Sequence, residues 1–108
     1  MSDHVVLFIT APSDDVATTL ANALVGEGLA ACVNRIPGVR STYRWEGKME
    51  VADEVLLLVK TRSASFEAVR ARVLELHPYT VPEIIALPIV AGHAPYLAWI
   101  DESTKPNA

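Results

Sequence analysis

The segment "LHPYTVPEIIALPI", Leu76–Ile89, places three side chains that could do chemistry close together along the chain. They are His77, Tyr79 and Glu83. An imidazole, a phenol and a carboxylate can bind a ligand or a metal ion, or transfer a proton. They can also join the end of a helix to the start of a strand through hydrogen bonds. The residue types alone leave these three alternatives open.

A lysine could complete such a site. Lys60 ends the apolar run "LLLVKT", and Glu83 begins the run "IIALPI". A carboxylate beside apolar residues needs a partner when it loses water. We therefore expect Lys60 and Glu83 to be neighbours at one end of a sheet. They would form either a structural ion pair or the charged lining of a small-molecule or metal pocket.

Cys32 is the only cysteine, and it follows two alanines in "AACVN". It is either a small buried apolar side chain or a reactive thiol or metal ligand. With His77 and Glu83 it would offer sulfur, nitrogen and oxygen donors, a set that suits Zn²⁺ or Cu²⁺ better than Ca²⁺ or Mg²⁺. His4 and His93 are predicted to be ordinary surface residues near the chain ends.

Several function classes are disfavoured by the composition. The net charge of −4 and the pI of about 5.2 provide no basic face for nucleic acid. A single cysteine can build neither an intrachain disulfide nor an iron–sulfur cluster. The loop "TAPSDD" would repel phosphate. Since no nucleophile–base pair is visible, we expect a protein that is not an enzyme.

The chain has 108 residues, the size of one domain, with a core over about residues 5–100. Its start, "MSDHVVLFIT", lacks the basic region of a signal peptide. No stretch approaches the ~18 apolar residues of a membrane span. We therefore expect a cytoplasmic protein that does not cross a membrane.

The elements that must position these residues alternate in type along the chain. Branched apolar runs predict strands, and apolar residues spaced by three and four predict helices. The first half is predicted to contain a strand at Val5–Thr10, a helix from Ser13 to Gly26 and a strand from Leu29 to Trp45 that bends at Pro37–Gly38. The second half is predicted to contain a strand at Met49–Thr61, a helix from Ser63 or Ser65 to Leu76 and a strand at Pro82–Ile89. A short helix to Ile100 and a polar tail at 101–108 follow. This β-α-β-β-α-β order predicts an α+β, ferredoxin-like sandwich.

The central hairpin is too long for the domain. From Ala30 to Trp45 an extended strand reaches roughly 50 Å, whereas a domain of this size is about 35 Å across. Gly47 is predicted to take a positive φ in the turn. Beyond the bend, Val39, Ser41, Tyr43 and Trp45 should point one way and Arg40, Thr42 and Arg44 the other. Because an overhanging ribbon needs a partner, and 51% of the residues are hydrophobic, we expect an oligomer that buries Tyr43 and Trp45 or their neighbours.

The chain resembles the CutA family, the divalent-cation tolerance proteins. The resemblance is carried by "TAPSDD", "LAACVNRIPGVRSTYRWEGK", "EVLLLVKT", "HPYTVPEIIALPI" and "YLAWI". It implies a ferredoxin-like fold assembled as a homotrimer through its long strands. It also implies a link to copper and other divalent metals, a likeness to the trimeric PII signalling proteins, and no settled enzymatic activity.

The resemblance also implies a set of site residues. The family's recurrent polar positions correspond to Cys32, Trp45, Glu46, Lys60, His77, Tyr79 and Glu83. Of these, Cys32, His77 and Glu83 are the candidate ligands of a Cu or Zn ion. The candidate ligand-binding residues at a subunit cleft are Trp45, Glu46, Lys60, His77, Tyr79 and Glu83. Ile9 stands where some copper-linked members have a cysteine. A second hypothesis is a PII-like effector module, in which Lys60, Arg44 and Tyr79 bind a small organic anion.

Overall fold

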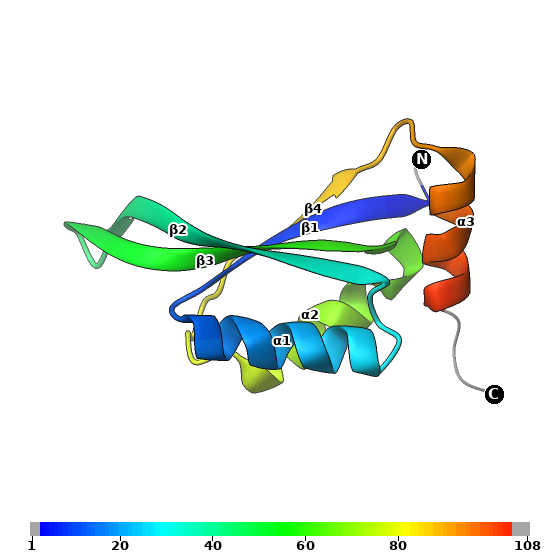
Figure 1. Ribbon diagram of the computed structural model, residues 1–108. Helices are drawn as coiled ribbons and strands as arrows, with labels where there is room; N and C mark the ends of the chain where they lie inside the picture. Colours follow the sequence, from blue (N-terminus) through cyan, green and yellow to red (C-terminus); the bar gives the residue numbers. More distant parts are fainter. Residues whose placement is uncertain (1–2, 105–108) are drawn as a thin grey trace.

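A computed structural model describes residues 3–104 of the chain. Its single sheet has four antiparallel strands in the order β2-β3-β1-β4. The strands are β1 (His4–Ala11), β2 (Cys32–Trp45), β3 (Lys48–Arg62) and β4 (Ile84–Pro88), and the helices are α1 (Asp14–Gly26), α2 (Phe66–Leu76) and α3 (Ala94–Ser103), with a short 3₁₀ turn η1 (Ser63–Ser65) before α2. The predicted ferredoxin-like order is confirmed (Figure 1).

Helices α1 and α2 lie side by side on one face of the sheet (Figure 1). Between them and the sheet is the core, in which alternate strand residues and the apolar helix faces are fully buried: Leu7, Ile9, Leu57, Val59, Leu20, Leu24, Val69 and Val73. Helix α1 begins at the predicted cap, where Ser13 Oγ accepts a hydrogen bond from the Val16 N–H at 3.2 Å. Ser65, one of the two serines predicted to begin the next helix, is the N-cap residue of α2, although its side chain makes no capping hydrogen bond.

The opposite face of the sheet carries apolar side chains that α1 and α2 do not reach. By register, Phe8 of β1 lies across from Ile85, and Val6 lies across from Leu87. Ile85 is 51% exposed and Leu87 is 42% exposed. We call this surface the open face. Its exposed apolar area is the kind that another protein surface usually covers.

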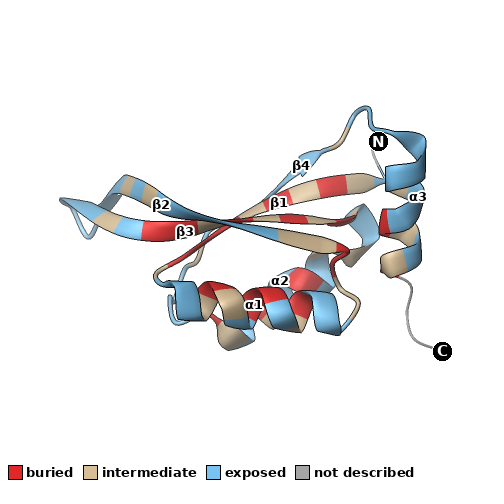
Figure 2. Cartoon of the chain, viewed as in Figure 1, coloured by how far each residue is buried: buried red, intermediate tan, exposed pale blue. Residues whose placement is uncertain are grey.

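Strands β2 and β3 continue past the core as a two-stranded ribbon, which projects beyond the helices in Figure 1 and is mostly exposed in Figure 2. The described chain measures 44 × 28 × 22 Å, and the ribbon lies along its longest dimension. The predicted bend is a bulge between Ile36 and Val39, with Gly38 at φ +80°. The turn at the tip has Gly47 at φ +78°, as predicted, and Glu46 also has a positive φ.

Two predicted strand limits are wrong. β2 begins at Cys32 rather than Leu29, because the N–H groups of Leu29 and Ala30 both donate to the Leu24 carbonyl, at 2.9 and 3.1 Å, and so close the end of α1. β4 covers only Ile84–Pro88, so Pro82 and Glu83 belong to the loop before it. Glu83 therefore precedes the strand that it was predicted to begin.

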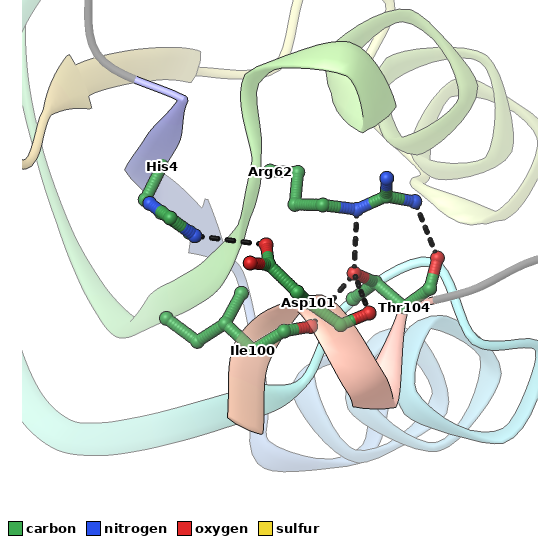
Figure 3. A network of polar contacts seen from close by, with 5 residues as sticks. All are labelled: His4, Arg62, Ile100, Asp101 and Thr104. Carbon is green, nitrogen blue, oxygen red and sulfur yellow. Dashed lines mark hydrogen bonds and ion pairs between the residues drawn. The ribbon is translucent and has the colours of Figure 1, made fainter. Parts of the chain in front are cut away.

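The predicted polar tail is also wrong for residues 101–104, because α3 continues to Ser103 and Thr104 caps it. Figure 3 shows how this end of the chain is held. The Arg62 guanidinium donates to Thr104 Oγ1 at 2.8 Å and to the Thr104 carbonyl at 2.6 Å. Asp101 Oδ1 lies 2.8 Å from His4 Nε2. His4 is therefore more than the surface residue predicted, whereas residues 105–108 of the predicted tail lie outside the described part.

None of the helices formed by residues 3–104 has the length and apolar character needed to traverse a bilayer.

Candidate functional site

His77 connects the end of α2 to β1. Only 6% of the residue is exposed. Its Nδ1 accepts a hydrogen bond from the Tyr79 N–H at 3.1 Å, and its Nε2 lies 2.8 Å from the Thr10 carbonyl oxygen. Because a carbonyl can only accept, Nε2 carries the proton and donates it. Both ring nitrogens are thus occupied, and this imidazole serves as a structural link between elements.

Tyr79 extends from the same loop toward β3. Its hydroxyl donates to Glu54 Oε2 over 3.3 Å. Burial, followed by the nearby Glu54 carboxylate, raises the pKa of the Tyr79 phenol, and Tyr43 adds a smaller effect in the same direction. The Tyr79 ring also packs on the His77 ring, with 4.8 Å between their centroids. The buried histidine therefore fixes the backbone that presents this phenol.

Two carboxylates share the same location. Glu54 is only 8% exposed although it lies on a strand that leads to solvent. Loss of water, and then the negative charge of Glu54, raise the pKa of the Glu83 carboxyl. Glu54 and Glu83 are thus close enough to repel each other. A bound positive charge would relieve that repulsion.

These groups line a pocket between the base of the ribbon and the loop that precedes β4. Its volume is about 820 Å³. We call it the acidic pocket; its lining residues are Thr10, Ser41, Thr42, Tyr43, Trp45, Glu54, Pro78, Tyr79, Thr80, Val81, Pro82 and Glu83. This lining contains two carboxylates, three aromatic rings and several hydroxyl groups. Within residues 3–104, no lysine, arginine or histidine contributes to this lining.

The sequence prediction missed Glu54. The available signal was a carboxylate directly before the apolar run "VLLLV" of β3, the same kind of placement that drew attention to Glu83. Trp45, Tyr79 and Glu83 were predicted as site residues, and the structure brings all three to the acidic pocket. His77 lies directly behind the pocket and supports Tyr79.

Lys60 and Glu83 are not neighbours, so that prediction is wrong. Lys60 lies across from Val6 of β1 and Cys32 of β2, and its Nζ donates to Asn34 Oδ1. Glu83 precedes Ile84, which lies across from Ile9 near the other end of β1. Antiparallel pairing places the end of β3 far from the beginning of β4. Within one chain, the Lys60 ammonium therefore does not neutralise the acidic pocket.

The structure separates the three predicted metal ligands within one chain. Cys32 lies at the Lys60 end of the sheet, whereas His77 and Glu83 lie at the Thr10 end. Among residues 3–104, no group of three histidine, cysteine or acidic side chains is arranged to hold a metal ion. Glu46 stands in the exposed turn at the tip of the ribbon. A metal site made from Cys32, His77 and Glu83 stays a prediction that needs more than one chain.

The architecture is that of a split β-α-β sandwich with a projecting two-stranded ribbon and an acidic, aromatic pocket at the ribbon's base. Residues 5–103 match the family model described as "CutA1 divalent ion tolerance protein". The chain belongs to this CutA1 divalent ion tolerance family.

Curated relatives carry the same family name. The chain is 56% identical, over 92% of its length and 96% of the relative's, to the divalent-cation tolerance protein CutA of Thermus thermophilus. It is 46% identical to a chloroplastic CutA protein of Arabidopsis thaliana over 94% of its length. The chain spans only 56% of that plant protein.

Solved structures agree with the fold. The Cut A1 structure from Thermus thermophilus superimposes with a TM-score of 0.93 at 54% identity, covering 94% of this chain and 99% of that one. A CutA structure from Xylella fastidiosa superimposes with a TM-score of 0.94 at 42% identity, covering 96% of this chain and all of that one.

Proposed function

We propose that this chain is a divalent-cation tolerance protein that acts by binding a cation rather than by catalysis, and that it works as a homotrimer in the cytoplasm. The observation that carries the binding proposal is the pair Glu54 and Glu83 in the acidic pocket. Glu54 is nearly buried, and loss of water, followed by the charge of Glu54, raises the pKa of the Glu83 carboxyl. Bound divalent cations would neutralise both groups.

The donors in the acidic pocket indicate which cations would fit. Carboxylate and hydroxyl oxygens from Glu54, Glu83 and Thr10 suit Mn²⁺, and Zn²⁺ also accepts carboxylate ligands. Cu(I) prefers thiolates, and Cys32 lies at the other end of the sheet while Ile9 occupies the position where some copper-linked relatives have a cysteine. We therefore propose Mn²⁺ or Zn²⁺ before copper as the ion bound by this pocket.

Isothermal titration calorimetry with MnCl₂ and ZnCl₂ tests this assignment. Glu54→Gln keeps the side-chain shape but removes the charge, and it should weaken binding at least tenfold. Glu50→Gln is the matched control, because Glu50 lies on the same strand and is exposed outside the pocket lining. Equal affinity in wild type and Glu54→Gln would refute the site.

The open face and the two outer strands of the sheet support the trimer. β2 and β4 are the outer strands of the sheet, so each can pair with a strand of another copy. On the ribbon, Met49 is 74% exposed and Val51 is 60% exposed. Head-to-tail pairing of such edges must close into a ring, and the family resemblance gives the number three. Light scattering should report about three times the 11.7 kDa chain mass, and a monomer would refute the proposal.

A PII-like effector module is the second candidate function. The supporting observation is the pocket volume of about 820 Å³, which is much larger than one metal ion needs. Within one chain neither Lys60 nor Arg44 lines the acidic pocket, so binding of an organic anion would need basic side chains from another copy. A thermal-shift screen of nucleotides, carboxylates and metals separates the two functions. Stabilisation by anions alone would favour the effector module.

A further inference from the structure

The contacts that hold α3 to its own chain are gathered at the C-terminal end of the helix (Figure 3). Among the residues of α3, all of which the structure describes, only Ile100 is buried by the chain itself. Thr104 caps the helix and is also buried, and its hydroxyl donates to the Ile100 carbonyl at 2.7 Å. These contacts form within one chain, so they do not require another copy.

Two polar contacts join this end of α3 to two different strands. Arg62 of β3 donates to Thr104 Oγ1 at 2.8 Å and to the Thr104 carbonyl at 2.6 Å. His4 of β1 has its Nε2 2.8 Å from Asp101 Oδ1. His4 and Arg62 are directly paired in the sheet, so they lie on the same face. The two contacts therefore hold the helix end side by side.

The two contacts respond differently to protons. An arginine side chain stays protonated in proteins, and neither a threonine hydroxyl nor a backbone carbonyl titrates near neutral pH, so the Arg62–Thr104 contact keeps its charge. An imidazole changes its charge between about pH 5 and pH 8. Its Nε2 can donate to Asp101 in either state. The bond from an imidazolium is charge-assisted, and such bonds are about twice as strong as neutral ones.

The groups around His4 leave it as the one that changes charge in this pH range. A second cavity, of about 360 Å³, is lined by Asp3, His4, Arg62, Ser63, Ala64 and Asp101. Carboxylates ordinarily stay ionised above about pH 5. Glu102, the next residue of α3, is exposed, and the neighbouring strand β4 (Ile84–Pro88) consists of apolar residues. Among the residues that line this cavity, protonation near neutral pH therefore acts at His4.

We propose that His4 and Asp101 form a proton-controlled latch for α3. When His4 carries a second proton, the charge-assisted bond holds the end of α3 to β1. When that proton leaves, the bond weakens and α3 opens locally more often. The imidazolium has its ionic partner only in the folded chain, so the stabilisation is complete at acidic pH and is lost as pH rises through the imidazole titration.

The expected effect is local and modest. The Asp101 side chain is 50% exposed, and water screens half-exposed ion pairs, so the latch governs the opening of one helix rather than unfolding of the whole chain. It is also independent of the proposed cation site. His4 is the first residue of β1, whereas Thr10, which lines the acidic pocket, lies near the other end of that strand. Failure of either proposal leaves the other standing.

Hydrogen exchange followed by mass spectrometry tests the latch in the full-length protein. Exchange at about pH 5.5 and about pH 8 is expressed as protection, which corrects for the intrinsic effect of pH on amide exchange, at a concentration where light scattering gives one mass. We expect the protection of α3 to fall about threefold at the higher pH. Helix α1 is the internal reference for changes in the stability of the whole chain. Equal protection of α3 at both pH values would overturn the proposal.

Two substitutions assign the response to the latch. His4→Gln keeps a side-chain N–H donor that does not titrate, and Asp101→Asn keeps an acceptor oxygen without the charge. Each should make the protection of α3 the same at both pH values. His93→Gln is the matched control, because His93 is exposed and precedes the other end of α3, and it should retain the threefold response.

The variants also show which outcomes contradict the latch. A pH response of α3 that survives in both His4→Gln and Asp101→Asn would overturn it, and so would a response lost only in His93→Gln. If His4→Gln destabilises the whole chain, as loss of protection in α1 would show, Asp101→Asn decides alone, because it leaves the His4 ring in place.

Discussion

The hydroxyl of Tyr79 donates a hydrogen bond to the carboxylate of Glu54, joining the loop after α2 to the base of the ribbon across 3.3 Å. Glu54 is nearly buried, so this bond compensates part of the water that it loses. The contact links two segments that lie far apart in the sequence. It also fixes the position of the carboxylate on which the proposed cation site depends.

Removing that hydroxyl should have a measurable cost. Tyr79→Phe keeps the ring but leaves one Glu54 oxygen without its donor, and we expect the free energy of unfolding to fall by about 1 kcal/mol. Urea denaturation followed by circular dichroism measures this change. Tyr96→Phe provides the control, because Tyr96 is exposed on α3 and away from the pocket. Equal losses in both variants would show that the Tyr79–Glu54 bond contributes nothing specific.

His77 should matter for stability more than for metal binding. His77→Ala removes two hydrogen bonds and leaves a buried space, so we expect destabilisation of about 2–4 kcal/mol. Its ring nitrogens already bond to Thr10 and Tyr79, so any loss of Zn²⁺ affinity should be small once the protein is folded. Thermal melting and calorimetry on the same samples measure both quantities, with exposed His93→Ala as the control. Loss of metal affinity at unchanged stability would instead identify His77 as a ligand.

Glu83 should make stability depend on pH. Its pKa is raised above the ordinary value of 4.5 in the folded state, so the native protein holds this proton more tightly than the unfolded chain does. The contribution to stability is therefore complete below pH 4.5 and is lost as pH rises through the higher folded pKa. Glu83→Gln should remove this dependence. Chemical denaturation of both proteins between pH 4 and 8 tests it; identical pH profiles would contradict the assignment.

Cation binding should also depend on the protonation of Glu83, but in the opposite direction: raising the pH should lower stability and strengthen cation binding. A divalent ion binds the ionised carboxylates, so binding displaces the proton that Glu83 holds. The affinity for Mn²⁺ should therefore rise as pH increases through the folded pKa of Glu83. Calorimetry in two buffers with different ionisation heats would detect the released proton. Absence of proton release near that pKa would place the metal elsewhere.

Thr104 should hold the end of α3 to the sheet. Its hydroxyl donates to the Ile100 carbonyl at 2.7 Å and accepts from Arg62, and only 3% of the residue is exposed. Thr104→Val preserves the shape and removes the hydroxyl, so we expect a loss of about 1–3 kcal/mol. Hydrogen exchange should accelerate in α3 more than in α1. Ser103→Ala, one residue earlier in the same helix, is the control, and equal exchange in the two variants would contradict this role.

The sequence predicts the fold well because its signals are local. The apolar runs, the Ser13 cap, Gly38 and Gly47 each determine structure within a few residues. The Lys60–Glu83 pairing failed because it depends on register between strands distant in the chain. Glu54 was missed for a similar reason: only the folded loop shows that Tyr79 covers it. The prediction of a polar tail at residues 101–104 failed because Arg62 and His4 bond to Thr104 and Asp101. These partners are distant in the sequence, so no local pattern predicts them.

The bulge in β2 determines which alternate side chains of the ribbon lie on the same face as Glu54, and so it sets the charge of the acidic pocket. Ile36 lies across from Leu56 and Val39 lies across from Glu54, so β2 contains one residue more than β3 at this point. That extra residue exchanges the two faces of everything beyond it, and it directs Tyr43 rather than Arg44 to the side of Glu54. Deleting Gly38 would remove the extra residue, so the alternation of β2 beyond this point would be reversed. Arg40 and Arg44 would then lie on the same face as the carboxylates. The proposed preference of this surface for cations would thus depend on the length of one strand, and it could be reversed without changing any residue that lines the pocket.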